Sequence, residues 1–113
     1  MPDLAEYLDE RGRSPFGKWL GRLNREARAE VTYAMVRLAR GYQSKQKFLG
    51  AGIAEYKINY GPGYRIYFGR DGDQLIILLG GVTNKQQSAD ILQAKANWKA
   101  YQHRKQRSDS RWH

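Results

Sequence analysis

The spacing of apolar residues changes near residue 47, from a helical period to the alternating period of β-strands. Upstream of this change, Ser14 followed by Pro15 is typical of a helix start, because Ser caps the helix and Pro fits its first position. Asn24 can cap a second helix, and Gly41 is suited to end it. The first part of the chain therefore predicts a helical hairpin.

Downstream of the change, Gly61-Pro62-Gly63 separates two alternating runs, Ile53 to Tyr60 and Tyr64 to Arg70. Glycine and proline between two such runs indicate a β-hairpin. The even-numbered positions are mostly apolar and are expected to pack on the helices. The odd-numbered positions 55, 57, 59, 65 and 67 are expected to form one polar face.

A loop centred on Pro62 would place Lys57 opposite Tyr67 and Asn59 opposite Arg65. In this arrangement Arg65 lies mid-strand on a solvated face. We therefore expect its truncation to alanine to change the free energy of unfolding by less than about 1 kcal/mol.

Three further elements complete the expected fold. Residues 74–79 contain the uninterrupted apolar run Leu75 to Leu79, which predicts a central strand covered on both faces and ended by Gly80-Gly81. A last helix is expected to begin between Thr83 and Ser88 and to fray from Gln102, and residues 1–9 to add an edge strand. The predicted fold is α+β, with a helical hairpin packed on a small antiparallel-rich sheet in the order β-α-α-β-β-β-α. We expect one domain over residues 1–104 and a basic polar tail over residues 105–113.

Composition excludes several kinds of chemistry. The chain has 113 residues and a net charge of +9, from 20 Lys and Arg against 11 Asp and Glu. It has no Cys and only two His, His103 and His113, so disulfides, thiolate zinc sites and a cysteine nucleophile are excluded and neither a metal nor a cofactor is expected. There is no signal-peptide pattern, and the longest apolar run is too short to span a bilayer. We expect a cytoplasmic protein that makes no use of a membrane and whose positive charge suits a polyanionic partner.

Several linked motifs occur in the order found in one protein family. They are Ser14-Pro15-Phe16 with Trp19-Leu20, Ala27-Arg28-Ala29 with Arg37-Leu38, Gly50 to Ile58, Tyr60 to Phe68, and Leu78 to Gly81 followed by Lys85, Gln87 and Asp90-Ile91. In these motifs the chain resembles the RelE/ParE superfamily of type II toxin-antitoxin toxins, and within it the HigB-like addiction module killer proteins. Asn84 stands where the family often has Lys, one residue before Lys85.

The resemblance implies a microbial ribonuclease-like fold and growth inhibition by the free protein. It also implies ribosome-dependent cleavage of mRNA, with mRNA and the ribosome as partners. A cognate antitoxin, expected to be a HigA-like helix-turn-helix protein, would neutralise the toxin, and contact with operator DNA would occur only through that antitoxin.

A metal-free ribonuclease needs groups that move protons at the 2′-hydroxyl and at the leaving 5′-oxygen, and donors that hold the charged transition state. The candidate catalytic residues are Arg65, Lys57, Tyr67 and Lys85. Arg65 can bind phosphate oxygens through its planar fork, and the lysines add positive charge. Tyr67 can stack on a base, transfer a proton, or serve only as a packing partner of Lys57.

Five further cations are candidate RNA-binding residues. They are Lys47, Arg25, Arg28, Arg37 and Arg40. The four arginines can form a solvated helix face, or they can grip ribosomal RNA or antitoxin carboxylates. Among the other residues singled out, Trp19 and Trp98 are expected in the core, and Glu55 is expected to balance nearby positive charge.

Three functions remain open on these grounds. The first is a ribosome-dependent mRNA endonuclease, and the second is a ParE-like poison of DNA gyrase that uses its helical surface. The third is a non-catalytic basic module held in an antitoxin complex, which the Asn at position 84 keeps in consideration.

Overall fold

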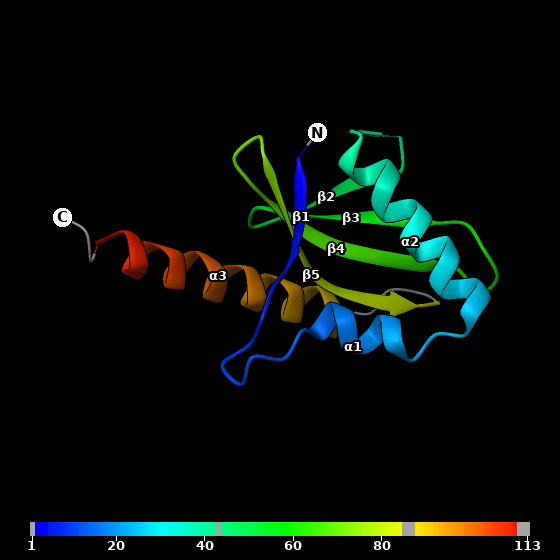
Figure 1. Ribbon diagram of the computed structural model, residues 1–113, viewed down its shortest axis with the longest axis horizontal. Helices are drawn as coiled ribbons and strands as arrows, with labels where there is room; N and C mark the ends of the chain where they lie inside the picture. The colour runs from blue at the N-terminus through cyan, green and yellow to red at the C-terminus, as the bar shows by residue number, and fades with distance from the viewer. Residues whose placement is uncertain (1, 43, 85–87, 111–113) are drawn as a thin grey trace.

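The computed structural model describes residues 2–42, 44–84 and 88–110. Two helices precede most of a five-stranded sheet, and a long helix follows it (Figure 1). In chain order the elements are β1 (Asp3–Glu6), α1 (Pro15–Gly21), α2 (Arg25–Ala39), β2 (Gln46–Gly50), β3 (Ile53–Ile58), β4 (Tyr64–Asp71), β5 (Leu75–Thr83) and α3 (Ser88–Ser110). The predicted α+β class is confirmed.

Local capping chemistry explains where α1 and α2 begin. The Ser14 hydroxyl accepts a hydrogen bond from the Gly17 backbone N–H at 2.8 Å, and the Asn24 side chain accepts one from the Ala27 N–H at 2.9 Å. Each bond satisfies a backbone donor that the first turn leaves unpaired. Gly41 follows the end of α2 with φ +86°, a left-handed conformation that glycine adopts without strain. The predicted helical hairpin boundaries are confirmed.

The sheet has the strand order β1-β5-β4-β3-β2, with β1 parallel to β5 and the other pairs antiparallel. The sequence prediction missed β2, so the order of elements contains one more strand than expected. It was also wrong about the end of β5, since Gly80 and Gly81 lie within this strand and pair with Tyr67 and Ile66. As expected, β5 is an interior strand whose residues Ile76–Leu79 are buried.

The register of the β3–β4 hairpin differs from the prediction by two residues. Lys57 pairs with Arg65, and Glu55 pairs with Tyr67. The Gly63 N–H donates to the Tyr60 carbonyl across the turn, and the register centres the hairpin on Gly61, one residue before Pro62. Because the shift is even, each side chain stays on its predicted face of the sheet.

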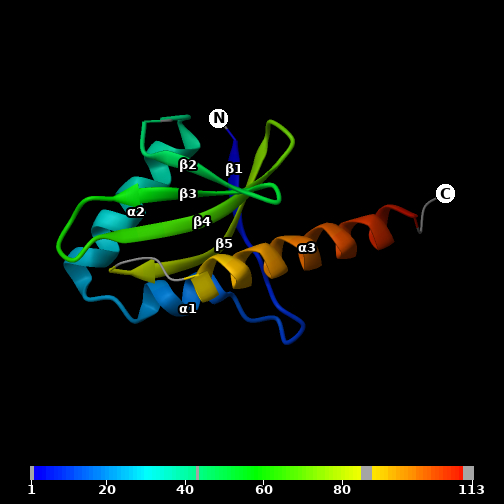
Figure 2. The same cartoon turned by 180° about the vertical axis from the view of Figure 1, so that it is seen from behind.

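The sheet separates two apolar layers, with α1 and α2 on one face and α3 on the other (Figures 1 and 2). The core under α1 and α2 includes the even-numbered hairpin residues Ala54, Tyr56, Ile58, Tyr64, Ile66 and Phe68. The core under α3 includes Ile53, Tyr67, Ile77, Leu79, Ala94 and Trp98. Trp98 is therefore a core residue as predicted, and Trp19 packs partly buried against the first core. The odd-numbered face is open near the hairpin turn and covered by α3 farther along.

The last helix extends farther than the sequence indicated. It continues to Ser110, where fraying was expected from Gln102, and the predicted domain boundary between residues 104 and 105 falls inside it. Asp71 accepts hydrogen bonds from the Tyr101 hydroxyl at 2.6 Å and from the Lys105 ammonium, and Arg104 donates to the Leu8 carbonyl at 2.9 Å. These contacts attach α3 to the rest of the protein beyond the helix residues that pack in the core. No helix in the described ranges has the length and hydropathy needed to span a membrane.

Candidate functional site

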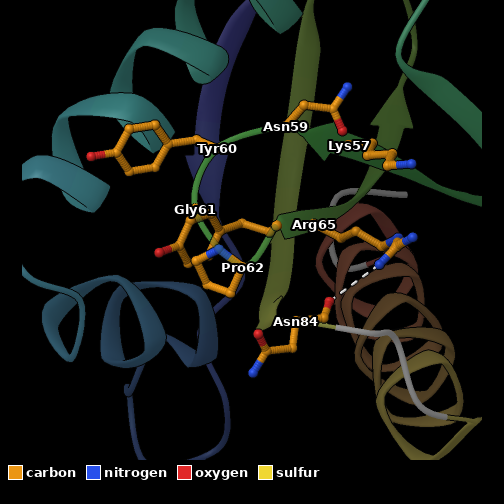
Figure 3. Close-up of a pocket in the computed structure, with 9 residues that line it drawn as sticks. Lys57, Asn59, Tyr60, Gly61, Pro62, Arg65 and Asn84 are labelled. Carbon is orange, nitrogen blue, oxygen red and sulfur yellow. Dashed lines mark hydrogen bonds between the residues drawn. The ribbon is translucent and has the colours of Figure 1, made fainter.

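A cavity of about 460 Å³ lies at the turn end of the β3–β4 hairpin, on the part of the odd-numbered face that α3 leaves open (Figure 3). Its lining residues come from the end of β3, the turn, the start of β4 and the residue after β5. They are Lys57, Asn59, Tyr60, Gly61, Pro62, Gly63, Tyr64, Arg65 and Asn84. In Figure 3 the side chains of Lys57 and Arg65 extend to the same side of the hairpin, and Tyr60 points the other way.

Arg65 is held by two contacts. Its Nε lies 2.8 Å from Glu55 Oε2, and its Nη1 donates to the Asn84 backbone carbonyl at 3.2 Å. The Arg65 side chain is 21% exposed, whereas that of Glu55 is 5% exposed. A buried carboxylate and a backbone carbonyl thus orient a guanidinium in the wall of a cavity that is open to solvent.

This ion pair confirms that Glu55 balances a neighbouring positive charge. It also corrects the expectation that Arg65 lies on a solvated face, on which the predicted cost of less than about 1 kcal/mol for its truncation depended. Truncation of Arg65 would leave the Glu55 carboxylate in the protein interior without its guanidinium partner, and such a charge is costly to keep there.

Lys57 is the second cation at the cavity. It pairs directly with Arg65 across the hairpin, and its side chain is exposed. Because Glu55 neutralises one of the two positive charges, the immediate group Lys57, Arg65 and Glu55 carries a net charge of +1. An exposed ammonium beside an oriented guanidinium can bind the oxygens of a phosphate and stabilise added negative charge.

Tyr67 does not line this cavity. It is 1% exposed and lines a separate cavity of about 110 Å³ between β5 and α3, together with Asp90, Gly80 and Asn97. Its hydroxyl has no hydrogen-bond partner among the described residues. Burial, and then the nearby carboxylates of Asp90 and Glu55, raise the pKa of Tyr67 to about 12. A ring so enclosed offers no face on which a base could stack.

The remaining catalytic candidate, Lys85, lies outside the described residues. Its neighbour Asn84 is exposed and has φ +70°, a left-handed conformation that Asn tolerates better than most residues. In this conformation its backbone carbonyl receives the Arg65 hydrogen bond. Sequence reasoning missed this role because it depends on a backbone atom, which residue type does not reveal.

The structure disperses the candidate RNA-binding residues. Lys47 is exposed on β2 opposite Glu55, and Arg25, Arg28 and Arg40 are exposed on or just after α2. Arg37 differs from them because it lines a second cavity together with Lys57. Arg37 therefore shares a cavity with a candidate catalytic residue.

The donor set of the site suits an anion rather than a metal. Its charged groups are a guanidinium, an ammonium and a carboxylate already paired with the guanidinium. In the ranges that the structure describes, no three His, Cys, Asp or Glu residues are grouped so that they could hold a metal ion. The arrangement can bind and polarise a phosphodiester through its cations.

Comparison with known proteins bears on the family to which the chain belongs. No protein-family model matches the chain. A protein of Haemophilus influenzae, named "Uncharacterized protein", is 38% identical over 81 residues, which cover 71% of this chain and 82% of that protein. Identity of this degree over most of both chains indicates common descent and a shared fold. The chain therefore belongs to the same family as this Haemophilus influenzae protein.

Proposed function

We propose that this chain is a toxin of the RelE/ParE superfamily, HigB-like in type, which inhibits translation by metal-independent cleavage of mRNA on the ribosome. The observation that supports the proposal most directly is the fixed guanidinium of Arg65 beside the exposed Lys57, at a cavity open to solvent. Preorganised cations of this kind stabilise the charge that develops on a phosphodiester during cleavage.

In the proposed reaction each residue has a distinct part. Arg65 binds the non-bridging oxygens of the scissile phosphate through its outer nitrogens, and Glu55 positions Arg65 for that contact. The Lys57 ammonium neutralises added negative charge and can donate a proton to the leaving 5′-oxygen. Water in the open cavity accepts the proton of the attacking 2′-hydroxyl, so that a 2′,3′-cyclic phosphate and a free 5′-hydroxyl are formed. Tyr67 supports β4 from the interior and does not contact the RNA, and Lys85 remains a candidate for a further cation.

The exposed cations of the protein also indicate the proposed partners. The exposed cations near the hairpin turn and on α2 would meet phosphates of mRNA and of ribosomal RNA. A cognate antitoxin, proposed to be a HigA-like helix-turn-helix protein, would neutralise the toxin by covering this surface with acidic side chains. Operator DNA would be reached only through the antitoxin.

The proposal is tested by removing both charges of the ion pair at once. The double variant Glu55→Gln, Arg65→Gln keeps the net charge and the approximate side-chain volumes, and it leaves no buried charge unpaired. We expect wild-type expression to arrest growth, and mRNA cleavage on ribosomes to fall by about a hundredfold or more in the variant. Glu10→Gln, Arg11→Gln is a matched control, because both residues lie outside the cavity and neither forms part of its wall.

Two results would contradict the proposal. The first is normal growth of cells that accumulate the wild-type protein in soluble form. The second is a folded double variant that arrests growth as strongly as the control.

A gyrase-directed function is the second candidate, supported by the exposed Arg25, Arg28 and Arg40 on the α2 side of the molecule. It predicts that removal of these arginines abolishes toxicity while the double variant keeps it. Inhibition of gyrase supercoiling by the purified protein would favour this candidate over RNA cleavage.

A further inference from the structure

A second cavity, of about 160 Å³, adjoins the first. It lies between α2 and the turn end of β3, and it shares Lys57 and Asn59 with the cavity at Arg65. A ligand bound along the protein could therefore pass from one cavity to the other at Lys57 without leaving the surface.

Three cations from different segments meet at this second cavity. They are Arg37 on α2, Lys45 just before β2 and Lys57 on β3. The Lys57 backbone N–H donates to the Lys45 backbone carbonyl at 3.0 Å, which places the main chains of the two lysines side by side. None of the three forms an ion pair with a carboxylate in the described ranges.

One carboxylate also lines the cavity, and its position matters. Glu30 lies seven residues before Arg37 on α2, a separation of about 10 Å along a helix axis. Glu30 thus stands at the opposite end of the cavity wall from Arg37. The cavity carries three positive charges against one negative charge and favours an anion at its Arg37 end.

Aromatic rings flank the arginine of this cavity. The Arg37 guanidinium carbon lies 5.3 Å from the centre of the Tyr33 ring and 6.0 Å from that of the Tyr42 ring. The two tyrosines are 62% and 51% exposed. Exposed aromatic rings next to cations are how proteins hold single-stranded nucleic acid, because bases stack on the rings while cations contact the phosphates.

We propose that the second cavity is a phosphate subsite for single-stranded RNA, in which Arg37, Lys45 and Lys57 hold a phosphate adjacent to the one bound at Arg65. The neighbouring base then stacks on Tyr33 or Tyr42. This inference rests on the proposed function, since it assigns the path of the RNA strand away from the cleavage site.

The test measures binding separately from cleavage. A fluorescently labelled hexamer of 2′-O-methyl uridine has no free 2′-hydroxyl and cannot be cleaved by attack of that group. Its affinity for the full chain is measured by anisotropy across a salt titration, for the wild type and for Arg37→Gln, Lys45→Gln. The control Arg11→Gln, Lys99→Gln removes the same two residue types from exposed positions outside both cavities.

We expect the subsite variant to bind the hexamer at least about tenfold more weakly than the control, because charged hydrogen bonds to the phosphate are removed. The slope of log affinity against log salt should also fall by about 0.7, since one phosphate of the hexamer is no longer neutralised by the protein. Lys45→Gln alone should give part of both effects while leaving the Arg37 packing on Tyr33 in place, which separates weaker binding from impaired folding.

Equal hexamer affinity and equal salt slope for the subsite variant and the control would overturn the subsite, even if the wild type cleaves mRNA. Weakened antitoxin binding with unchanged hexamer binding would also overturn it and assign the cavity to the antitoxin. Conversely, a wild type that binds the hexamer through Arg37 and Lys45 but cleaves no mRNA would support the subsite and refute the proposed ribonuclease.

Discussion

Arg65 and Tyr67 lie two residues apart on the same face of β4, yet one is at a solvent-open cavity and the other is 1% exposed. The difference comes from α3, which begins at Ser88 and packs Ala94 and Trp98 over the part of the face that contains Tyr67. Whether a residue on this face of β4 is exposed to solvent therefore depends on whether α3 covers it. The site lies where that cover ends.

The largest effect on stability is expected from truncating a large α3 side chain that covers this face of the sheet. Trp98 is 5% exposed and stacks on Tyr101 with ring centres 5.4 Å apart. Trp98→Ala should lower the free energy of unfolding by about 3–5 kcal/mol, because it opens a cavity in the covered region. Urea denaturation measures this loss. Leu92→Ala on the same helix is the control, and since Leu92 is 65% exposed it should change stability by less than about 0.5 kcal/mol. Similar losses for the two variants would show that α3 does not form a core with the sheet.

Gly80 and Gly81 are adjacent in β5 and test how closely Trp19 packs against the sheet. A Cβ added at Gly81 would lie 2.2 Å from a Trp19 ring carbon, whereas one added at Gly80 would meet no atom within 4 Å. Gly81→Ala should therefore destabilise the fold by about 1–3 kcal/mol, and it should disturb the Trp19 Nε1 bond to the Thr83 hydroxyl. Gly80→Ala should stay within about 0.5 kcal/mol of the wild type. Thermal unfolding of both variants decides the point, and a larger loss for Gly80→Ala would contradict the packing described here.

At the open end, Arg65 and Lys57 should differ although they pair across the hairpin. Arg65→Ala should cost about 1–3 kcal/mol, because the buried Glu55 carboxylate loses its guanidinium. Lys57→Ala should cost less than about 0.5 kcal/mol, since its side chain is exposed. Chemical denaturation at neutral pH compares them. Adding Glu55→Gln to Arg65→Ala should recover part of the loss, and no recovery would mean that the Arg65 stem, not its charge, is the stabilising part.

The smallest effect on stability is expected at the contacts that Asp71 makes with Tyr101 and Lys105 of α3. Hydrogen bonds from Lys105 and Tyr101 lower the pKa of Asp71 below its usual value of 3.8. A lowered pKa stabilises the folded state above the unfolded pKa, and this contribution is lost as the pH falls through the lower, folded value. Asp71→Asn should therefore cost less than about 1 kcal/mol at pH 7, and the difference from the wild type should shrink as the pH falls below 3.8. Unfolding free energies measured across this range provide the test, and a difference independent of pH would exclude a role for the charge.

Helix starts and strands that depend only on residues close together in the sequence could be predicted. The caps Ser14 and Asn24 act within one turn of helix, so their residue types locate both helix starts. The apolar run Ile76–Leu79 identified an interior strand because both of its faces are buried. In contrast, β2 has five residues, of which Lys47 and Phe48 are both exposed, so its sequence did not distinguish it as a separate strand.

Features set by contacts between distant segments could not be predicted. The sequence of the turn did not show that the hairpin is centred before Pro62. The predicted register of β3 and β4 was wrong for this reason. The burial of Tyr67 depends on where α3 crosses the sheet, which no local pattern encodes. For the site, the cationic residues could be named from the sequence, but the burial of Glu55 and the Asn84 carbonyl contact required the three-dimensional structure.

The parallel pairing of β1 with β5 has a consequence for how the sheet is completed. Asp3–Glu6 pairs with Leu75–Leu78, so the partners are separated by about seventy residues of chain. Contacts this distant in sequence form late in folding, because a long loop must close first. Until β1 docks, β5 is an edge strand that presents its apolar residues Ile76–Leu79 and unpaired backbone groups to other chains. Anything that delays docking of the first strand, such as a bulky fusion at the N-terminus, should therefore promote aggregation through β5 while leaving the hairpin and its cations intact.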